Sequence, residues 1–153
     1  MRNLRVDFLR PVSSAPKLSA FEAQDAFVDA AAKGNLGQVK ALLQPDGGAT
    51  IDGRDRYAYT ALMAAAQEGH LHVVKYLIKN GANVHTKNND GLTPLHKCMY
   101  HNNKVPILLK NGADINASDH VGNTPLHMTV KNKNFEGFSI LLESGADVNA
   151  KTR

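Results

Sequence analysis

The chain has 153 residues, of which 42% are hydrophobic and 21% charged, and its formal net charge is +4 at pH 7. Its single cysteine, Cys98, excludes an intramolecular disulfide and any metal cage built from several thiolates, so the reducing cytosol or nucleus is the expected compartment. No apolar run reaches the ~18 residues that indicate a membrane span, so we expect a soluble protein that does not enter a membrane.

Residues 1–19 are predicted to form a flexible basic tail ahead of the folded region. Three arginines and Lys17 outnumber Asp7 in this segment, and prolines with serines between them indicate a linker. A disordered tail and a strand packed on the first folded unit both fit this composition. A mitochondrial transit peptide fits less well, because Asp7 and the early Pro11 are atypical of such peptides.

The first folded unit, residues 20–54, opens with a pattern typical of a helix start. Ser19 and Glu22 have the spacing of a capping box, which predicts a helix from about Ala20. An alanine-rich stretch and then a second aliphatic cluster follow. The unit is more divergent than those after it, because its junction with the next loop carries two extra residues.

Three further units, 55–87, 88–118 and 119–151, repeat the same landmarks. Each has a threonine followed by an apolar stretch, a second aliphatic cluster and the sequence Gly-Ala-Asx. The threonines recur at about the 33-residue period that is typical of repeat proteins. The threonines and glycines that define the period are Thr60, Thr93 and Thr124, and Gly81, Gly112 and Gly145.

The landmarks predict the same local structure in each unit. Thr93 and Thr124 precede proline, which is typical of an N-cap with proline at the first helical position. The cluster at 71–78 has the apolar spacing of a second helix, and Gly81 suits the left-handed backbone that follows a helix end. The polar segment 83–91 predicts a projecting, hairpin-like loop. Each unit is therefore expected to contain two short antiparallel helices and a loop.

The Thr-Pro-Leu-His sequences at 93–96 and 124–127, with their period and the Gly-Ala-Asp motifs, resemble the ankyrin repeat. The resemblance extends from about Ala20 to the end of the chain. It implies an all-α ankyrin-repeat solenoid of helix-turn-helix pairs with projecting hairpin loops, in which each unit packs on its neighbours.

Two departures from the family pattern carry structural expectations. Unit three is two residues short around 102–104, and Pro106 is expected to restrict its second helix to roughly Lys104–Lys110. In unit four, Lys133 replaces the family's turn glycine, at a cost of ~1 kcal/mol if the backbone there is left-handed. The last helix lacks an obvious polar cap, so the chain either was cut from a longer array or is covered at this end.

No catalytic, cofactor or metal site is expected, and the chain is predicted not to be an enzyme. By the resemblance, His96 and His127 tie a helix start to the neighbouring hairpin loop. His70 and His72 are expected to diverge by about 200° on a helix, which is the wrong geometry for a shared metal. Cys98 stands where the family has a buried alanine, so we expect a packed thiol. Phosphate loops, nucleophile elbows and paired carboxylates are missing from the sequence.

The resemblance implies that a partner is bound by the loop tips and the exposed ends of the first helices, which together line a concave face. The loop-tip residues are Arg56, Tyr57, Tyr59, Asn89, Asp90, Leu92, His120, Val121 and Asn123. The helix-end residues are Gln67, Glu68, Tyr100, His101, Lys131 and Asn132. The residues at the loop junctions are Arg54, Lys87 and Ser118.

One group of these residues is both basic and aromatic: Arg54, Arg56, Tyr57 and Tyr59, with Lys87 one unit away. Arginine and tyrosine are enriched in interface hot spots, so we predict that this group anchors an acidic or phosphorylated partner segment. The alternative is that each tyrosine ring lies flat on the adjacent loop tip.

The function expected from the sequence is a protein–protein interaction module in the cytoplasm or nucleus. Two alternatives stay open: a regulatory or targeting segment of a larger enzyme or channel, and a small ankyrin-type enzyme inhibitor. Residues 56–113 carry a net +5, but much of the remaining positive charge lies on the short tail, so nucleic acid is not an expected partner. The chain is expected to be a monomer unless another chain covers its last unit.

Overall fold

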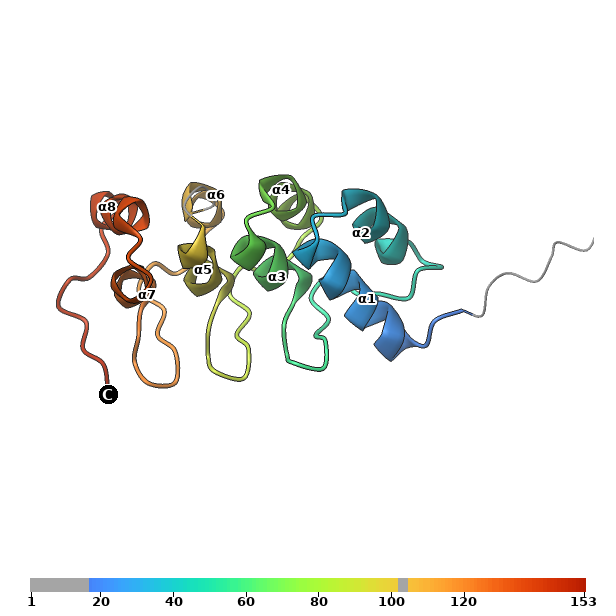
Figure 1. Cartoon of the computed structure of the whole chain (residues 1–153), viewed down its shortest axis with the longest axis horizontal. Helices are drawn as coiled ribbons and strands as arrows, with labels where there is room; N and C mark the ends of the chain where they lie inside the picture. Colours follow the sequence, from blue (N-terminus) through green and yellow to red (C-terminus); the bar gives the residue numbers. More distant parts are fainter. Residues whose placement is uncertain (1–16, 102–104) are drawn as a thin grey trace, which may run out of the picture.

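The structure, a computed structural model, describes residues 17–101 and 105–153. Figure 1 shows two rows of helices, one with α1, α3, α5 and α7 and the other with α2, α4, α6 and α8, and long loops that project from the first row. The elements are α1 (Ala20–Ala32), α2 (Leu36–Leu43), α3 (Ala61–Glu68), α4 (Leu71–Lys79), α5 (Pro94–Lys97), the 3₁₀ helix η1 (Cys98–Tyr100), α6 (Val105–Lys110), α7 (Pro125–Lys131) and α8 (Phe135–Glu143). The all-α solenoid is confirmed, and no strand occurs within the described ranges.

The helices of the first row begin where their caps predict. Ser19 Oγ accepts the N–H of Glu22 at 3.2 Å and Glu22 Oε2 accepts the N–H of Ser19 at 2.9 Å, which completes the capping box of α1. Thr60 caps α3 through the N–H of Met63 at 3.3 Å. Thr93 caps α5, with proline at the next position as expected. These bonds satisfy N–H groups that have no partner inside a helix.

The third helix pair is the shortest. Its first helix has four α-helical residues and continues as η1, and its second helix, α6, runs from Val105 to Lys110. This agrees with the expected shortening. Pro106 is the second residue of α6, where the missing N–H removes no hydrogen bond inside the helix. The deletion around 102–104 lies outside the described residues, and so do residues 1–16 of the predicted tail at 1–19.

Among the described residues, two other than glycine have a left-handed backbone. Lys133, which links α7 to α8, has φ 54°, so the expected replacement of a turn glycine is confirmed. Ala58, in the first long loop, has φ 62°, which the sequence pattern does not predict. The corresponding positions in the next two loops are Gly91 and Gly122, with φ of 80° and 86°.

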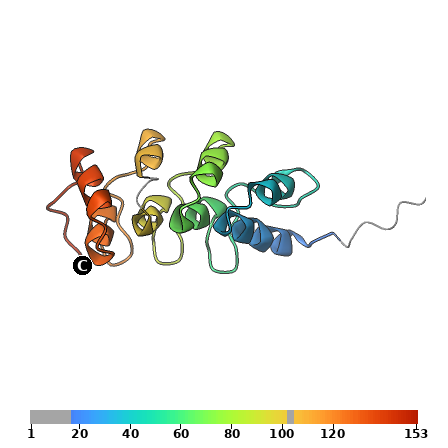
Figure 2. The ribbon, with the colours of Figure 1, turned by 45° about the horizontal axis from the view of Figure 1, so that its top comes forward.

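The apolar core runs through the stack between the two rows of helices and has no single centre. Each helix pair contributes at least one side chain with at most 1% exposure, among them Phe27, Leu62, Leu95, Leu108 and Leu141. Cys98 is also fully buried, as predicted. Figure 2 shows the pairs following one another along the molecule. Each predicted unit contains one pair, and the unit boundaries themselves stay a prediction.

Each of the described helices is too short or too polar to cross a lipid bilayer.

Candidate partner-binding surface

Each long loop is held in shape by the side chain of its first residue. Asp55 Oδ1 accepts the N–H groups of Tyr57 at 2.8 Å and of Tyr59 at 2.9 Å. Asn88 and Asp119 make the equivalent pairs of hydrogen bonds in the next two loops. An Asx side chain that accepts two N–H groups fixes a tight turn, so the loop tips are preorganised before any partner arrives.

Hydrogen bonds between neighbouring units hold the loops in register. His96 Nε2 lies 3.0 Å from the carbonyl oxygen of Asn123, and its Nδ1 accepts the N–H of Thr93 at 3.1 Å. This confirms that His96 ties its helix start to the next loop. Burial lowers the pKa of His96 below 6.5, because a charged imidazole loses hydration there. His127 Nδ1 accepts the N–H of Thr124 in the same way, at 3.1 Å.

Asn123, predicted as a contact residue, has a structural side chain. It is 8% exposed and its Nδ2 donates to Asp119 Oδ2 at 2.9 Å. Burial acts to raise the pKa of Asp119, but hydrogen bonds from Asn123 and from the N–H of Val121 outweigh it and hold the pKa below 3.8. The Asn123 side chain is thus mostly buried and bonded within the chain, and its role in partner contact stays a prediction.

The other predicted residues differ in how far they are exposed. The half-buried ones are Tyr59, Gln67, Leu92 and Asn132. The exposed ones are Arg54, Arg56, Tyr57, Glu68, Lys87, Asn89, Asp90, Tyr100, His101, Ser118, His120, Val121 and Lys131.

The basic and aromatic group is already engaged in contacts within the chain. Lys97 Nζ lies 4.5 Å from the centroid of the Tyr59 ring and donates to the Tyr59 hydroxyl. Lys87 Nζ donates to the carbonyl oxygen of Ser118 at 2.9 Å. Tyr57 is different, because this residue is 69% exposed at the loop tip.

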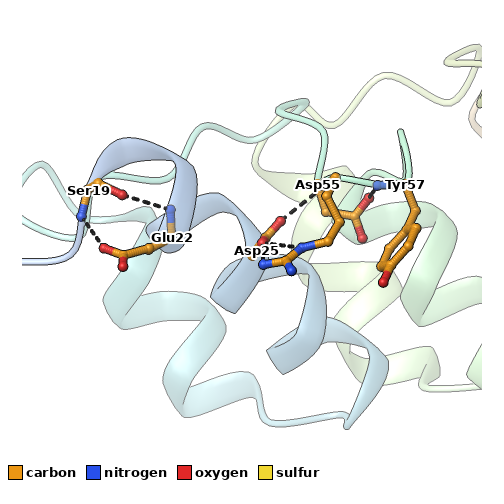
Figure 3. A network of polar contacts seen from close by, with 6 residues as sticks. Ser19, Glu22, Asp25, Asp55 and Tyr57 are labelled. Atoms are coloured by element: carbon orange, nitrogen blue, oxygen red, sulfur yellow. Dashed lines mark hydrogen bonds and ion pairs between the residues drawn. The ribbon is translucent and has the colours of Figure 1, made fainter.

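Arg56 is ion-paired with Asp25 of α1. Figure 3 shows Asp25 close to the loop that carries Asp55 and Tyr57. The Nε of Arg56 donates to Asp25 Oδ2 at 2.8 Å and the Arg56 backbone N–H donates to Asp25 Oδ1 at 3.1 Å. The guanidinium also lies 5.7 Å from the centroid of the Phe21 ring. The hydrogen bond from Arg56 lowers the pKa of Asp25 below 3.8, and Asp25 raises the pKa of Arg56.

His70 and His72 lie together, so the expected divergence of their rings is wrong. The ring centroids are 6.0 Å apart, and the Nε2 atoms contact the carbonyl oxygens of Ala32 (2.9 Å) and Gly34 (2.8 Å). His70 is the N-cap of α4 and not a helical residue, so the helical spacing rule does not apply to it. Across residues 17–101 and 105–153, no three His, Cys, Asp or Glu side chains are grouped to hold a metal.

An open groove of about 620 Å³ lies between α1, the 55–59 loop and the end of α3. From the predicted surface it includes Arg56, Tyr57, Tyr59, Gln67 and Glu68. The remaining lining was not predicted and comes mostly from α1, as Asp25, Val28, Asp29 and Ala32. Spacings of three and four residues place these on one helix face, which is the sequence signal that could have found them.

Comparison with known proteins agrees with this architecture. A model described as ankyrin repeats (3 copies) matches residues 12–88 and 80–152. Ankyrin repeat and SOCS box protein 3 of Bos taurus is 33% identical over 119 residues, which is 67% of this chain and 21% of that protein. Notch-regulated ankyrin repeat-containing protein of Homo sapiens is 34% identical over 80 residues, 51% of this chain and 70% of that protein.

A third similar protein is ankyrin repeat and MYND domain-containing protein 1 of Mus musculus, 37% identical over 69 residues, 45% of this chain and 8% of that protein. The chain thus spans about a fifth of the bovine SOCS-box relative and less of the mouse MYND-domain relative. The matched model, the capped helix pairs and the loops in register lead to one assignment: the chain belongs to the ankyrin-repeat family.

Proposed function

We propose that the chain is a non-enzymatic adaptor module that holds a protein partner on its loop tips and on the exposed ends of its first helices. Ankyrin repeats are generally protein–protein interaction modules. The observation that carries the proposal is the set of three loops fixed by Asp55, Asn88 and Asp119. A surface that is rigid before binding loses little conformational entropy on association.

A second candidate is a regulatory or targeting segment within a longer protein. Ankyrin repeat and SOCS box protein 3 of Bos taurus is several times longer than the region that matches this chain, since only 21% of its length is covered. The same surface would then hold either another domain of the protein or a separate partner. A small inhibitor that blocks an enzyme cleft through the loop tips stays a prediction from the sequence.

The cellular setting is also part of the proposal. We place the module in the cytoplasm or nucleus, as a monomer that binds protein and not nucleic acid. The support for the compartment is the single thiol, Cys98, which is buried in the core and is typical of a reducing environment. Fluorescence imaging of the intact chain fused at its C-terminus tests the location, and localisation to mitochondria would contradict it.

Position-specific photocrosslinking tests the binding surface. A photoreactive residue is placed at Tyr57, at Leu92 or at Val121, one for each loop. The matched control positions are exposed residues of the second helices, Lys40, Lys75 and Ser139. We expect crosslinked protein adducts from the loop positions and few from the controls. Adducts from the second helices alone, or from neither set, would overturn the proposed surface.

A further inference from the structure

The groove beside the 55–59 loop combines an apolar floor with an exposed aromatic rim. Val28 and Ala64 are each 5% exposed and form the floor together with the half-buried Ala32. Tyr57 stands at the rim with most of its ring in solvent. Such a surface suits the aliphatic stem of a long side chain, which gains by covering apolar area while its polar end stays in water.

The charges that line the groove are mostly negative. Four carboxylates line it, those of Asp25, Asp29, Asp55 and Glu68, against the single guanidinium of Arg56. Arg56 is paired with Asp25 and also attracts Asp55, but one positive charge cannot neutralise the further carboxylates of Asp29, Asp55 and Glu68.

These three carboxylates differ in how far the chain itself satisfies them. Asp29 is paired with Lys33 at 2.7 Å, but both side chains are more than half exposed, and such pairs exchange readily with solvent and other ions. Glu68 Oε1 accepts one hydrogen bond from the Gln67 amide at 3.1 Å. Asp55 accepts backbone N–H groups through Oδ1. A cation in the groove would therefore meet carboxylates that no strong ion pair neutralises.

Resting on the proposed function, we propose that this groove holds a lysine or arginine side chain from an extended, basic segment of the protein partner. Its stem lies on the floor at Val28 and Ala64, and its charge lies between Asp29 and Glu68, beside the Tyr57 ring. A cation over an aromatic face is favourable, and residues that line the groove already make such contacts, Lys97 with Tyr59 and Arg56 with Phe21.

The charge of the groove argues against the acidic or phosphorylated segment expected from the sequence. That expectation rested on Arg54, Arg56, Tyr57, Tyr59 and Lys87 as a free basic group. In the structure Arg56 is paired with Asp25, and neither Arg54 nor Lys87 lines the groove. An acidic segment would face like charges, which costs free energy, whereas a basic one is complementary.

The test compares three labelled peptides of equal length in a Gly-Ser background: one with lysine and arginine, one with glutamate and aspartate, and one with phosphoserine. Binding to the full chain is followed by fluorescence anisotropy at low and high salt. Because residues 1–16 carry three arginines, a chain with Arg2, Arg5 and Arg10 replaced by Gln is measured in parallel. We expect the basic peptide to bind best and to weaken with salt.

The groove variant is Asp29→Asn with Glu68→Gln, and its matched control is Asp46→Asn with Glu143→Gln, which changes the net charge equally at exposed sites outside the groove. We expect the groove variant to weaken the basic peptide by about fivefold to tenfold and the control by less than about twofold. Equal weakening by both variants, preference for either negative peptide, or no basic binding by either chain would overturn the inference. If one of these results occurs while the loop-tip positions still form crosslinked adducts, the proposed function is retained. Only the inference of a basic partner segment is then rejected.

Discussion

Arg56, at the tip of the first long loop, is bound through its backbone and its side chain to Asp25, which lies 31 residues earlier in α1. The pairing connects the loop of the second unit to the first helix of the stack. The pairing fixes one wall of the groove. It also neutralises the guanidinium of Arg56, which the sequence had suggested would bind an acidic partner.

Replacing Arg56 with Gln should raise the pKa of Asp25 toward 3.8, because the hydrogen bond that lowers it is lost. In the parent, the lowered pKa of Asp25 gives a stability contribution that is present above 3.8 and is lost as the pH falls through the folded value. NMR titration of the Asp25 carboxyl measures the shift. Arg54→Gln is the control, and an equal shift in both variants would contradict the assigned pairing.

His96 should make the fold less stable in mild acid. Its pKa is lowered in the folded chain, so the unfolded chain takes up a proton near pH 6.5 while the folded chain takes it up only at lower pH. The free energy of unfolding therefore falls as the pH decreases from 7 through 6.5 toward the folded pKa.

Urea unfolding of the parent and of His96→Gln at a series of pH values measures this effect. We expect the variant to be less stable at neutral pH and to lose most of the slope between pH 7 and the folded pKa of His96. His85→Gln, at an exposed loop position, controls for the removal of an imidazole. A slope that survives in His96→Gln would assign the pH dependence to other groups.

The parts of the fold that the sequence predicted well depend on short-range chemistry. A cap at Ser19 or Thr93 acts on N–H groups two or three residues away, so the helix starts are visible locally. Pro106 restricts its own helix in the same way. The left-handed backbone at Lys133 was considered because the ankyrin repeat, which the sequence resembles, has a turn glycine at this position.

The parts that were missed depend on contacts between units. The pairing of Arg56 with Asp25 joins residues that are 31 positions apart, and the local sequence around either residue does not predict it. The Nε2 atoms of His70 and His72 contact carbonyl oxygens of the first unit. A helical projection of one segment does not include contacts with another unit. The acidic groove likewise forms only when α1 and α3 lie side by side. The loop residues taken alone had therefore suggested a basic binding surface.

Leu95→Ala tests whether the stack depends on its third, short unit. Leu95 is fully buried in α5, which contacts both α3 and α7. Truncation should lower the free energy of unfolding by about 2–5 kcal/mol and weaken the coupling between the second and fourth units. Chemical denaturation measures the loss, with Leu142→Ala, which is 38% exposed, as the milder control. An unchanged midpoint would contradict the stacked core.

Ala58→Gly should stabilise the protein, because Ala58 has φ 62° where the next two loops have glycine. Relief of the left-handed strain outweighs the added flexibility of glycine, for a net gain of about 0.5–1 kcal/mol. Gly91→Ala is the reverse change, and its Cβ would lie 2.6 Å from His120 Cδ2, so it should destabilise. Thermal unfolding compares the two variants, and a stabilised Gly91→Ala would show that the loops do not need this backbone.

The outer face of the last helix pair offers the final test, because it presents apolar residues where the inner units bury theirs. Val130 lies six residues after its landmark threonine and is 65% exposed, whereas Met99, at the equivalent position of the third unit, is fully buried. Val130→Glu should therefore change the free energy of unfolding by less than about 0.5 kcal/mol, since its charge stays hydrated. Met99→Glu should cost about 3 kcal/mol or more, since it buries a carboxylate without a partner. If denaturation shows a comparable loss for both variants, Val130 is covered in solution.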